Sequence, residues 1–114
     1  MKSISMSLLL TVAAVTMPIA SNVQAQSLQV KQWAASCAAC HGTDGYSVGG
    51  MASLAGQSKS SLIEKMAGYK SGKVEATIMH QLSKGYSDEQ IEKIAEYFAA
   101  LPKEKPVVQP AIKK

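Results

Sequence analysis

The 114-residue sequence contains no arginine, so its 12 basic residues are all lysine, and they exceed the 8 acidic residues by a net charge of +4. The planar, bidentate recognition of bases and phosphates that arginine provides is therefore absent. The lysines are scattered among acids and do not alternate with aromatic residues, which argues against a nucleic-acid-binding surface. A glycine motif for binding dinucleotides is also absent.

Cysteine is nearly absent as well, with Cys37 and Cys40 the only two in the chain. A disulfide between them would be sterically poor on a helix and would close only a very small loop. A chain of this length forms one small domain, whose thin core generally needs a metal, disulfides or a cofactor in addition. No stretch alternates apolar and polar residues as a strand does. The sequence therefore predicts an all-α domain with a bound group.

Long hydrophobic runs are lacking too, since the apolar run at residues 8–15 is short of the roughly 20 residues that a membrane span requires. Lys2 precedes this run, and Val23 and Ala25 stand at the −3 and −1 positions of a cleavage site. This pattern is typical of a secretory signal peptide over residues 1–25. We expect export to the periplasm with no membrane span left after cleavage, and an uncleaved anchor is the alternative.

Periodicity and capping signals predict four helices in a domain over residues 26–102, followed by a flexible tail rich in proline and lysine at 103–114. The predicted helices cover residues 28–40, 61–70, 74–82 and 88–101. Ser61 with Glu64, and Ser87 with Gln90, match the capping box that begins a helix. The loop at 42–57 contains five glycines. They predict turns with positive φ and a close approach to a flat or bulky group.

The decisive motif is Cys37-Ala38-Ala39-Cys40-His41. Two thiols one helical turn apart can both form thioethers with the vinyl groups of one haem, and the next histidine is then placed to bind the iron. The spacing C-x-x-C-H is the signature of covalent haem attachment, and histidine is a common proximal ligand. We therefore predict one covalent haem c, with His41 as the proximal ligand.

Other uses of these residues fit less well. A thioredoxin-type pair needs a βαβ setting. A structural zinc site needs four ligands, and only His80 could join Cys37, Cys40 and His41, two of which are adjacent.

Four residues are candidates for the second axial ligand: Met51, Met66, Met79 and His80. Met66 lies on the apolar face of the second predicted helix and suits the core. Met51 is only ten residues beyond His41. Met79 lies farther along, where the returning chain can cover the distal side of a haem. We predict Met79, which raises the haem potential, with His80 and an open site as alternatives.

The sequence resembles the class I cytochromes c. Leu54-Ala55-Gly56-Gln57 and Tyr69-Lys70-Ser71-Gly72 are similar to segments of cytochromes c4 and c553. A closer resemblance, to the monohaem cytochrome subunit of flavocytochrome c sulfide dehydrogenase, lies in Cys40-His41-Gly42-Thr43-Asp44-Gly45, Thr77-Ile78-Met79 and Lys84-Gly85-Tyr86-Ser87.

The resemblance implies a small class I cytochrome c fold, with about four helices around one haem and the first and last helices crossing near Trp33 and Phe98. It implies His41 and Met79 as axial ligands. It also implies an electron-transfer role without catalysis, in which a flavoprotein partner oxidises sulfide and this chain passes its electrons to a downstream acceptor protein. Many relatives orient the proximal histidine with a proline carbonyl, and the loop at 49–53 has no proline.

Two rival functions remain open: a free soluble carrier like c553 or c4, and a haem enzyme with an open distal site. The lysines expected around the distal side fit two interpretations, a ring that steers an acidic partner or an ordinary solvated surface. These lysines are residues 59, 65, 70, 73 and 84.

Overall fold

The computed structural model describes residues 20–107, so the apolar run at 8–15 and the end of the tail at 108–114 lie outside the described residues. The helical elements are α1 (Ala20–His41), the 3₁₀ helix η1 (Thr43–Gly45), α2 (Lys59–Ser71), α3 (Met79–Lys84) and α4 (Asp88–Ala99). No strand occurs among residues 20–107. The predicted all-α class with four main helices is confirmed.

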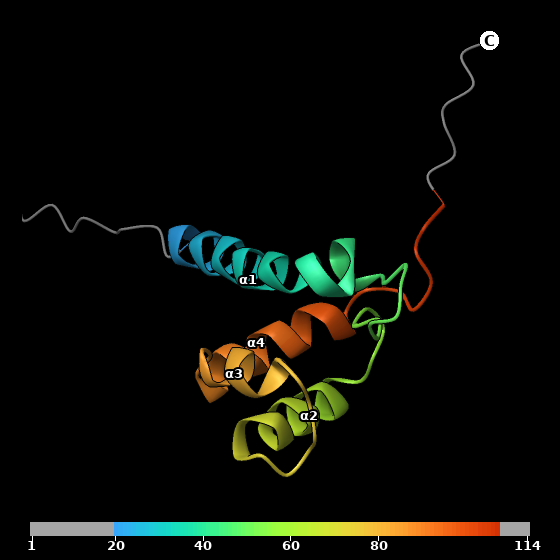
Figure 1. The fold of residues 1–114 in the computed structure, drawn as a ribbon. Coiled ribbons are helices and arrows are strands. Elements are labelled where there is room, and N and C mark those ends of the chain that lie inside the picture. The colour runs from blue at the N-terminus through green and yellow to red at the C-terminus, as the bar shows by residue number, and fades with distance from the viewer. Residues whose placement is uncertain (1–19, 108–114) are drawn as a thin grey trace, which may run out of the picture.

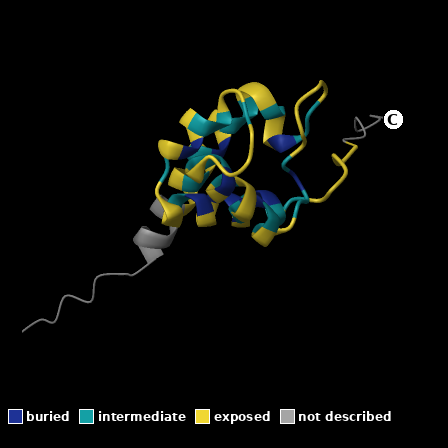
Figure 2. Cartoon of the chain, turned by 60° about the horizontal axis from the view of Figure 1, so that its bottom comes forward, coloured by how far each residue is buried: buried dark blue, intermediate teal, exposed yellow. Residues whose placement is uncertain are grey.

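Helix α4 lies between α1 and α2, and α3 packs beside α2 (Figure 1). The buried core is formed by Ala34, Leu62, Ile94, Ala95 and Phe98. Trp33 and Tyr97 pack against it from α1 and α4. The buried residues therefore lie on the helix faces that turn toward one another, and residues on the outward faces are exposed (Figure 2). The predicted packing of the first helix against the last is confirmed.

The apolar face of the first helix lies where periodicity placed it. Ala34 is buried, and Val30, Trp33 and Cys37 are partly buried. Helix α1 nevertheless begins at Ala20 and not at residue 28, so the predicted cleavage position after Ala25 lies within it. The apolar period starts only at Val30, and the residues before it carried no signal that could have located the first turns.

The two predicted capping boxes differ in outcome. At α4 the Ser87 hydroxyl accepts from the backbone N–H of Gln90 at 3.2 Å, and the Gln90 side chain accepts from the backbone N–H of Ser87 at 2.8 Å. At α2 the prediction of Ser61 with Glu64 was wrong, because the cap is Ser58, whose hydroxyl accepts from the N–H of Ser61 at 3.3 Å. Three serines offered similar signals, and the first of them begins the helix.

The third helix was predicted at 74–82 but forms only at Met79–Lys84. The preceding segment crosses α2 instead, where the N–H of Val74 donates to the carbonyl of Gly68 at 3.1 Å. A Cβ on Gly68 would lie 2.4 Å from Val74 Cγ2, so this close crossing requires glycine. Tertiary contact with α2 therefore overrides the helical pattern of the segment.

Candidate haem site

Helix α1 presents both cysteines of the motif, one turn apart on the same side of the helix. Both are free thiols, so no disulfide joins them. Cys40 is exposed, whereas Cys37 is partly buried against the core. Burial raises the pKa of the Cys37 thiol, and a hydrogen bond with Ser36 opposes this increase. Two unpaired thiols at this spacing suit attachment to a single porphyrin.

His41 is the last residue of α1, and its ring is oriented by the loop that follows. Its Nδ1 lies 2.6 Å from the carbonyl oxygen of Ala52. A carbonyl only accepts, so Nδ1 carries the proton and Nε2 has a free lone pair for a metal. Such a backbone acceptor fixes the tautomer and direction of a metal-binding histidine. The sequence could not show which carbonyl accepts the hydrogen bond from the His41 ring, and the structure identifies it as that of Ala52.

A tight turn at Gly42 returns the loop toward His41. The N–H of Gly42 donates to the carbonyl of Ala38 at 3.0 Å, and the carbonyl of Gly42 accepts from Gly45 at 2.9 Å. Gly42 has a φ of 82°, and a Cβ there would lie 2.0 Å from the carbonyl oxygen of Tyr46. Only glycine fits such a position without displacing the turn.

Two tyrosines tie the surrounding segments together, a role that spacing alone could not reveal. The Tyr86 hydroxyl lies 2.6 Å from the Ser36 hydroxyl, which itself donates to the carbonyl of Trp33 at 2.6 Å. Tyr86 is therefore the donor in the bond between the two hydroxyls. This bond joins the segment before α4 to the turn of α1 beside Cys37. Tyr46 donates to the carbonyl of Pro102 at 2.6 Å.

The candidates for the second ligand lie in different settings. Met79 is the first residue of α3 and is partly buried, as is Met66 on α2, whereas Met51 is exposed. Both ring nitrogens of His80 are engaged: Nδ1 with the carbonyl of Tyr69 and Nε2 with the N–H of Ala76, each at 3.0 Å. Iron ligation by His80 would require at least one of these hydrogen bonds to break.

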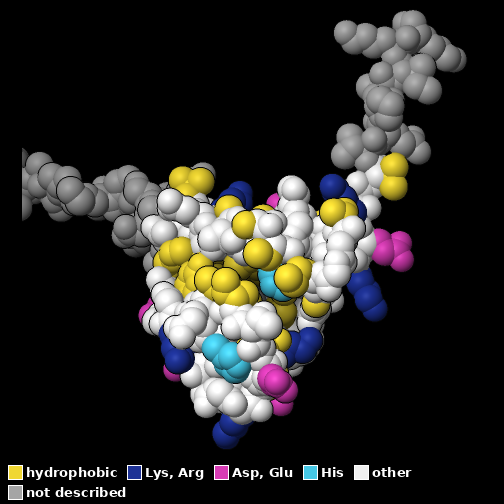
Figure 3. Space-filling model, viewed as in Figure 1, with side chains coloured by type: hydrophobic (Ala, Val, Ile, Leu, Met, Phe, Trp, Pro, Cys, Tyr) yellow, Lys and Arg dark blue, Asp and Glu magenta, His cyan; other side chains and the backbone are white. Residues whose placement is uncertain are grey.

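An apolar surface accompanies these groups. Four large apolar side chains in the loop at 42–57 and in the segment from 74 through α3 are between 39% and 53% exposed. They are Met51, Val74, Ile78 and Leu82. Figure 3 shows hydrophobic side chains gathered in a band beneath α1, with a histidine side chain among them. Two free thiols one helical turn apart, an oriented imidazole and this hydrophobic band fit a haem.

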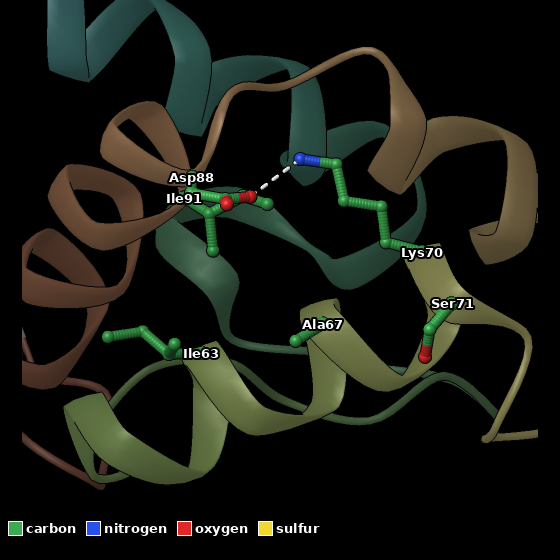
Figure 4. A pocket seen from close by; sticks show the side chains of 6 residues that line it. All are labelled: Ile63, Ala67, Lys70, Ser71, Asp88 and Ile91. Carbon is green, nitrogen blue, oxygen red and sulfur yellow. Dashed lines mark hydrogen bonds and ion pairs between the residues drawn. The ribbon is translucent and has the colours of Figure 1, made fainter.

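The hollow between α2 and α4 is separate from these residues (Figure 4). It is lined by Ile63, Ala67, Lys70, Ser71, Asp88 and Ile91. Another hollow lies between α1, η1 and α4, lined by Lys31, Ala34, Ala35, Ala38, Thr43, Asp44 and Tyr97. None of the predicted site residues lines either of them.

Several of the lysines expected around the distal side have partners within the chain. Lys70 pairs with Asp88 at 2.7 Å, as drawn in Figure 4, and Lys59 pairs with Glu92 at 2.8 Å. Lys65 donates to the side-chain carbonyl of Gln57 at 3.1 Å. The other two, Lys73 and Lys84, are exposed and form no ion pair with any described residue.

Residues 20–107 lack two further features. No helix in that range is both long and apolar enough to cross a membrane. No three side chains of histidine, cysteine, aspartate or glutamate in the same range come together in a way that could hold a metal ion.

Comparison with known proteins agrees with this geometry. Residues 27–98 match the family model described as cytochrome C oxidase, cbb3-type, subunit III. The chain is 35% identical over 71 residues to cytochrome c-553 of Nitratidesulfovibrio vulgaris, covering 58% of this chain and 70% of that protein. The chain therefore belongs to the cytochrome c family, whose members carry electrons, and its cofactor is covalently bound haem c.

Other relatives extend the comparison. The cytochrome subunit of sulfide dehydrogenase of Chlorobaculum tepidum is 43% identical over 68 residues, covering 60% of this chain. The match spans 62% of that relative's length. Cytochrome c-554(548) of Halomonas halodenitrificans is 37% identical over 68 residues, which cover 56% of this chain and 82% of that protein.

Proposed function

We propose that the chain is an exported monohaem cytochrome c that accepts single electrons from a sulfide-oxidising flavoprotein and passes them to a redox acceptor protein. The observation that carries the haem site is the contact between His41 Nδ1 and the Ala52 carbonyl, which leaves Nε2 free beside two unpaired thiols. Residues 1–25 serve as the signal peptide, 26–102 as the cytochrome domain and 103–114 as a flexible tail.

Each site residue has a distinct part in this proposal. Cys37 and Cys40 hold the haem through thioethers, each thiol adding across one vinyl group. His41 would be the proximal ligand of the iron and Met79 the distal ligand. Haem iron, when bound, supplies one-electron chemistry by changing between the ferrous and ferric states. With both residues bound to the iron, no position would remain for oxygen or a substrate, and the chain would hold, orient and shield the haem.

The flavoprotein partner is supported by the relative from Chlorobaculum tepidum, whose name describes a cytochrome subunit of sulfide dehydrogenase. The chain itself has no glycine motif for binding a dinucleotide and no cysteine beyond the haem motif. A flavin and a reactive disulfide would therefore come from the partner.

A free soluble carrier is the second candidate, and a specific observation favours it. The matches to cytochromes c-553 and c-554(548) cover 70% and 82% of those proteins, against 62% of the sulfide dehydrogenase subunit. The two candidates share the haem site and differ only in the electron donor.

The site is tested by producing the full chain in a host that matures c-type cytochromes. We expect haem that stays with the polypeptide under denaturing conditions, and its loss when Cys37 and Cys40 are both changed to serine. A colourless wild-type protein would contradict the proposal.

The second ligand is tested by two substitutions. Met79→Ala should lose the weak methionine–iron band at the red end of the spectrum, and Met51→Leu should keep it.

The partner is tested by following haem reduction after sulfide is added, with and without a purified flavoprotein subunit of sulfide dehydrogenase. We expect the flavoprotein to accelerate reduction and to co-elute with the cytochrome in gel filtration. Equal rates in both mixtures, with separate elution, would leave the free carrier as the function.

A further inference from the structure

We propose that His80 is a positioning residue that fastens the start of α3 to the end of α2 and thereby holds Met79 in place for the haem iron. This inference rests on the proposed function, in which Met79 is the distal ligand. It assigns His80 a role as a support and not as a ligand.

The imidazole of His80 bridges two stretches of backbone. Its Nδ1 donates to the carbonyl of Tyr69 near the end of α2, because a carbonyl can only accept. Its Nε2 accepts from the N–H of Ala76 in the segment that leads into α3. The Tyr69 ring also meets the imidazole edge-on, with ring centroids 6.5 Å apart. One side chain thus joins α2, the connecting segment and α3.

Helix α3 needs support from outside itself. It has only six residues, Met79–Lys84, and its N-cap residue Ile78 offers no side-chain hydrogen bond. A helix this short is unstable alone, so tertiary contacts determine its position. Helix α3 packs against α2, and the hydrogen bonds that tie its start to neighbouring segments are the two of His80, with the bond from Val74 to Gly68 farther back along the chain.

Met79 precedes His80 directly, so any movement of this anchor moves the backbone from which the Met79 side chain extends. Loosening the anchor should increase the fraction of molecules in which Met79 has left the iron. A small external ligand such as imidazole competes for that open fraction, and its apparent affinity rises in proportion. His80 can therefore be tested without measuring electron transfer.

The experiment compares His80→Ala, His80→Asn and His80→Gln in the holoprotein. Asparagine can place a donor near Nδ1 and glutamine an acceptor near Nε2, so each can keep one of the two hydrogen bonds. Ferric proteins are titrated with imidazole, and the methionine–iron band is recorded. We expect the apparent Kd for imidazole to fall about tenfold in His80→Ala and about threefold in the other two, because the open fraction rises by those factors. The methionine–iron band should weaken only by the increase in the open fraction itself.

The matched control is Gln81→Ala, an exposed position in the same helix, which should leave the imidazole affinity unchanged.

Met79→Ala tests the underlying function in the same assay. If Met79→Ala loses the band while all His80 variants keep wild-type affinity and intensity, the positioning role is overturned and Met79 ligation stands. If Met79→Ala keeps the wild-type spectrum while His80→Ala changes it, His80 is itself the ligand and both proposals fail. Should His80→Ala yield no holoprotein, the asparagine and glutamine variants decide by the same criteria.

Discussion

The ring of His41 donates a hydrogen bond to the backbone carbonyl of Ala52 at 2.6 Å, across a loop in which no proline serves as the acceptor. The direction of the imidazole therefore depends on the path of the whole loop, and that path begins at the tight turn of Gly42. The proximal side of the site is defined by backbone geometry more than by side chains.

Replacement of Gly42 by alanine should destabilise the holoprotein by about 2 kcal/mol or more, because the positive φ is strained for a residue with a Cβ and that atom would meet the Tyr46 carbonyl. Gly50→Ala is the matched control, since nothing lies within 4 Å of the Cβ position there. Denaturant unfolding followed at the haem band gives both values. Equal stability of the two variants would show that the turn does not depend on Gly42.

Removal of the α2 cap should distinguish the serine that begins the helix from the one that the sequence suggested. Ser58→Ala removes the acceptor for the N–H of Ser61 and should cost about 1 kcal/mol. Ser61→Ala removes a hydroxyl that caps nothing and should change stability by only a few tenths of a kcal/mol. Thermal unfolding of the two holoproteins provides the comparison. A larger loss of stability in Ser61→Ala than in Ser58→Ala would support the cap at Ser61 that the sequence predicted.

Truncation of the central aromatic side chain should produce the largest loss of stability in the domain. Phe98 is 1% exposed and belongs to the core cluster between the helices. Phe98→Ala should cost about 3–5 kcal/mol, the range for a buried phenylalanine that leaves a cavity. Val48→Ala, at a side chain that is 100% exposed, should be nearly neutral. A small loss at Phe98 would mean that bound haem, and not this cluster, dominates the core.

Acid should weaken the contact between α2 and α4. The hydrogen bond from Lys59 lowers the pKa of Glu92 below its ordinary value of 4.5, so the carboxylate stabilises the fold above that pH and loses this effect as pH falls through the lowered pKa. Wild type should exceed Glu92→Gln in stability at pH 7, and the difference should vanish in acid. High salt should shrink it at any pH. Glu75→Gln, at an exposed residue that forms no ion pair with any described residue, is the control. A stability difference between wild type and Glu92→Gln that persists in acid would contradict this account.

Local sequence patterns predicted correctly those elements for which the apolar periodicity and the capping signals indicate a single position. In α4 the apolar periodicity and the capping box indicate the same helix. The residues of its apolar face that are buried are Ile91, Ile94, Ala95 and Phe98. The signals failed where several positions competed or where packing decided. Ser58 and Ser61 offered similar caps, and Val74 bonds to Gly68 near the end of α2 although the pattern of the segment from Val74 favours a helix.

In the candidate site, too, some residues could be predicted from the sequence and others could not. The haem motif is contiguous, so its residues could be named from spacing alone. Ala52 could not be found, because its contribution is a backbone carbonyl that any residue has. The bond between Tyr86 and Ser36 joins residues 50 apart and becomes visible only when α1 and the segment before α4 are placed together. His80 was considered as a ligand because spacing cannot show that both its nitrogens are bound to backbone.

The ion pairs of Lys59 and Lys70 reduce the electrostatic attraction that an approaching protein would experience from these two lysines. Each lysine is held by a carboxylate of α4, so at a distance the pair acts as a small dipole and not as a free charge. Among the five lysines expected around the distal side, long-range attraction of an acidic partner then depends mainly on Lys73, Lys84 and Lys65, whose hydrogen-bond partner is an uncharged glutamine. Association of the cytochrome with such a partner should consequently slow only gently as ionic strength rises, and recognition would depend more on apolar contact at close range.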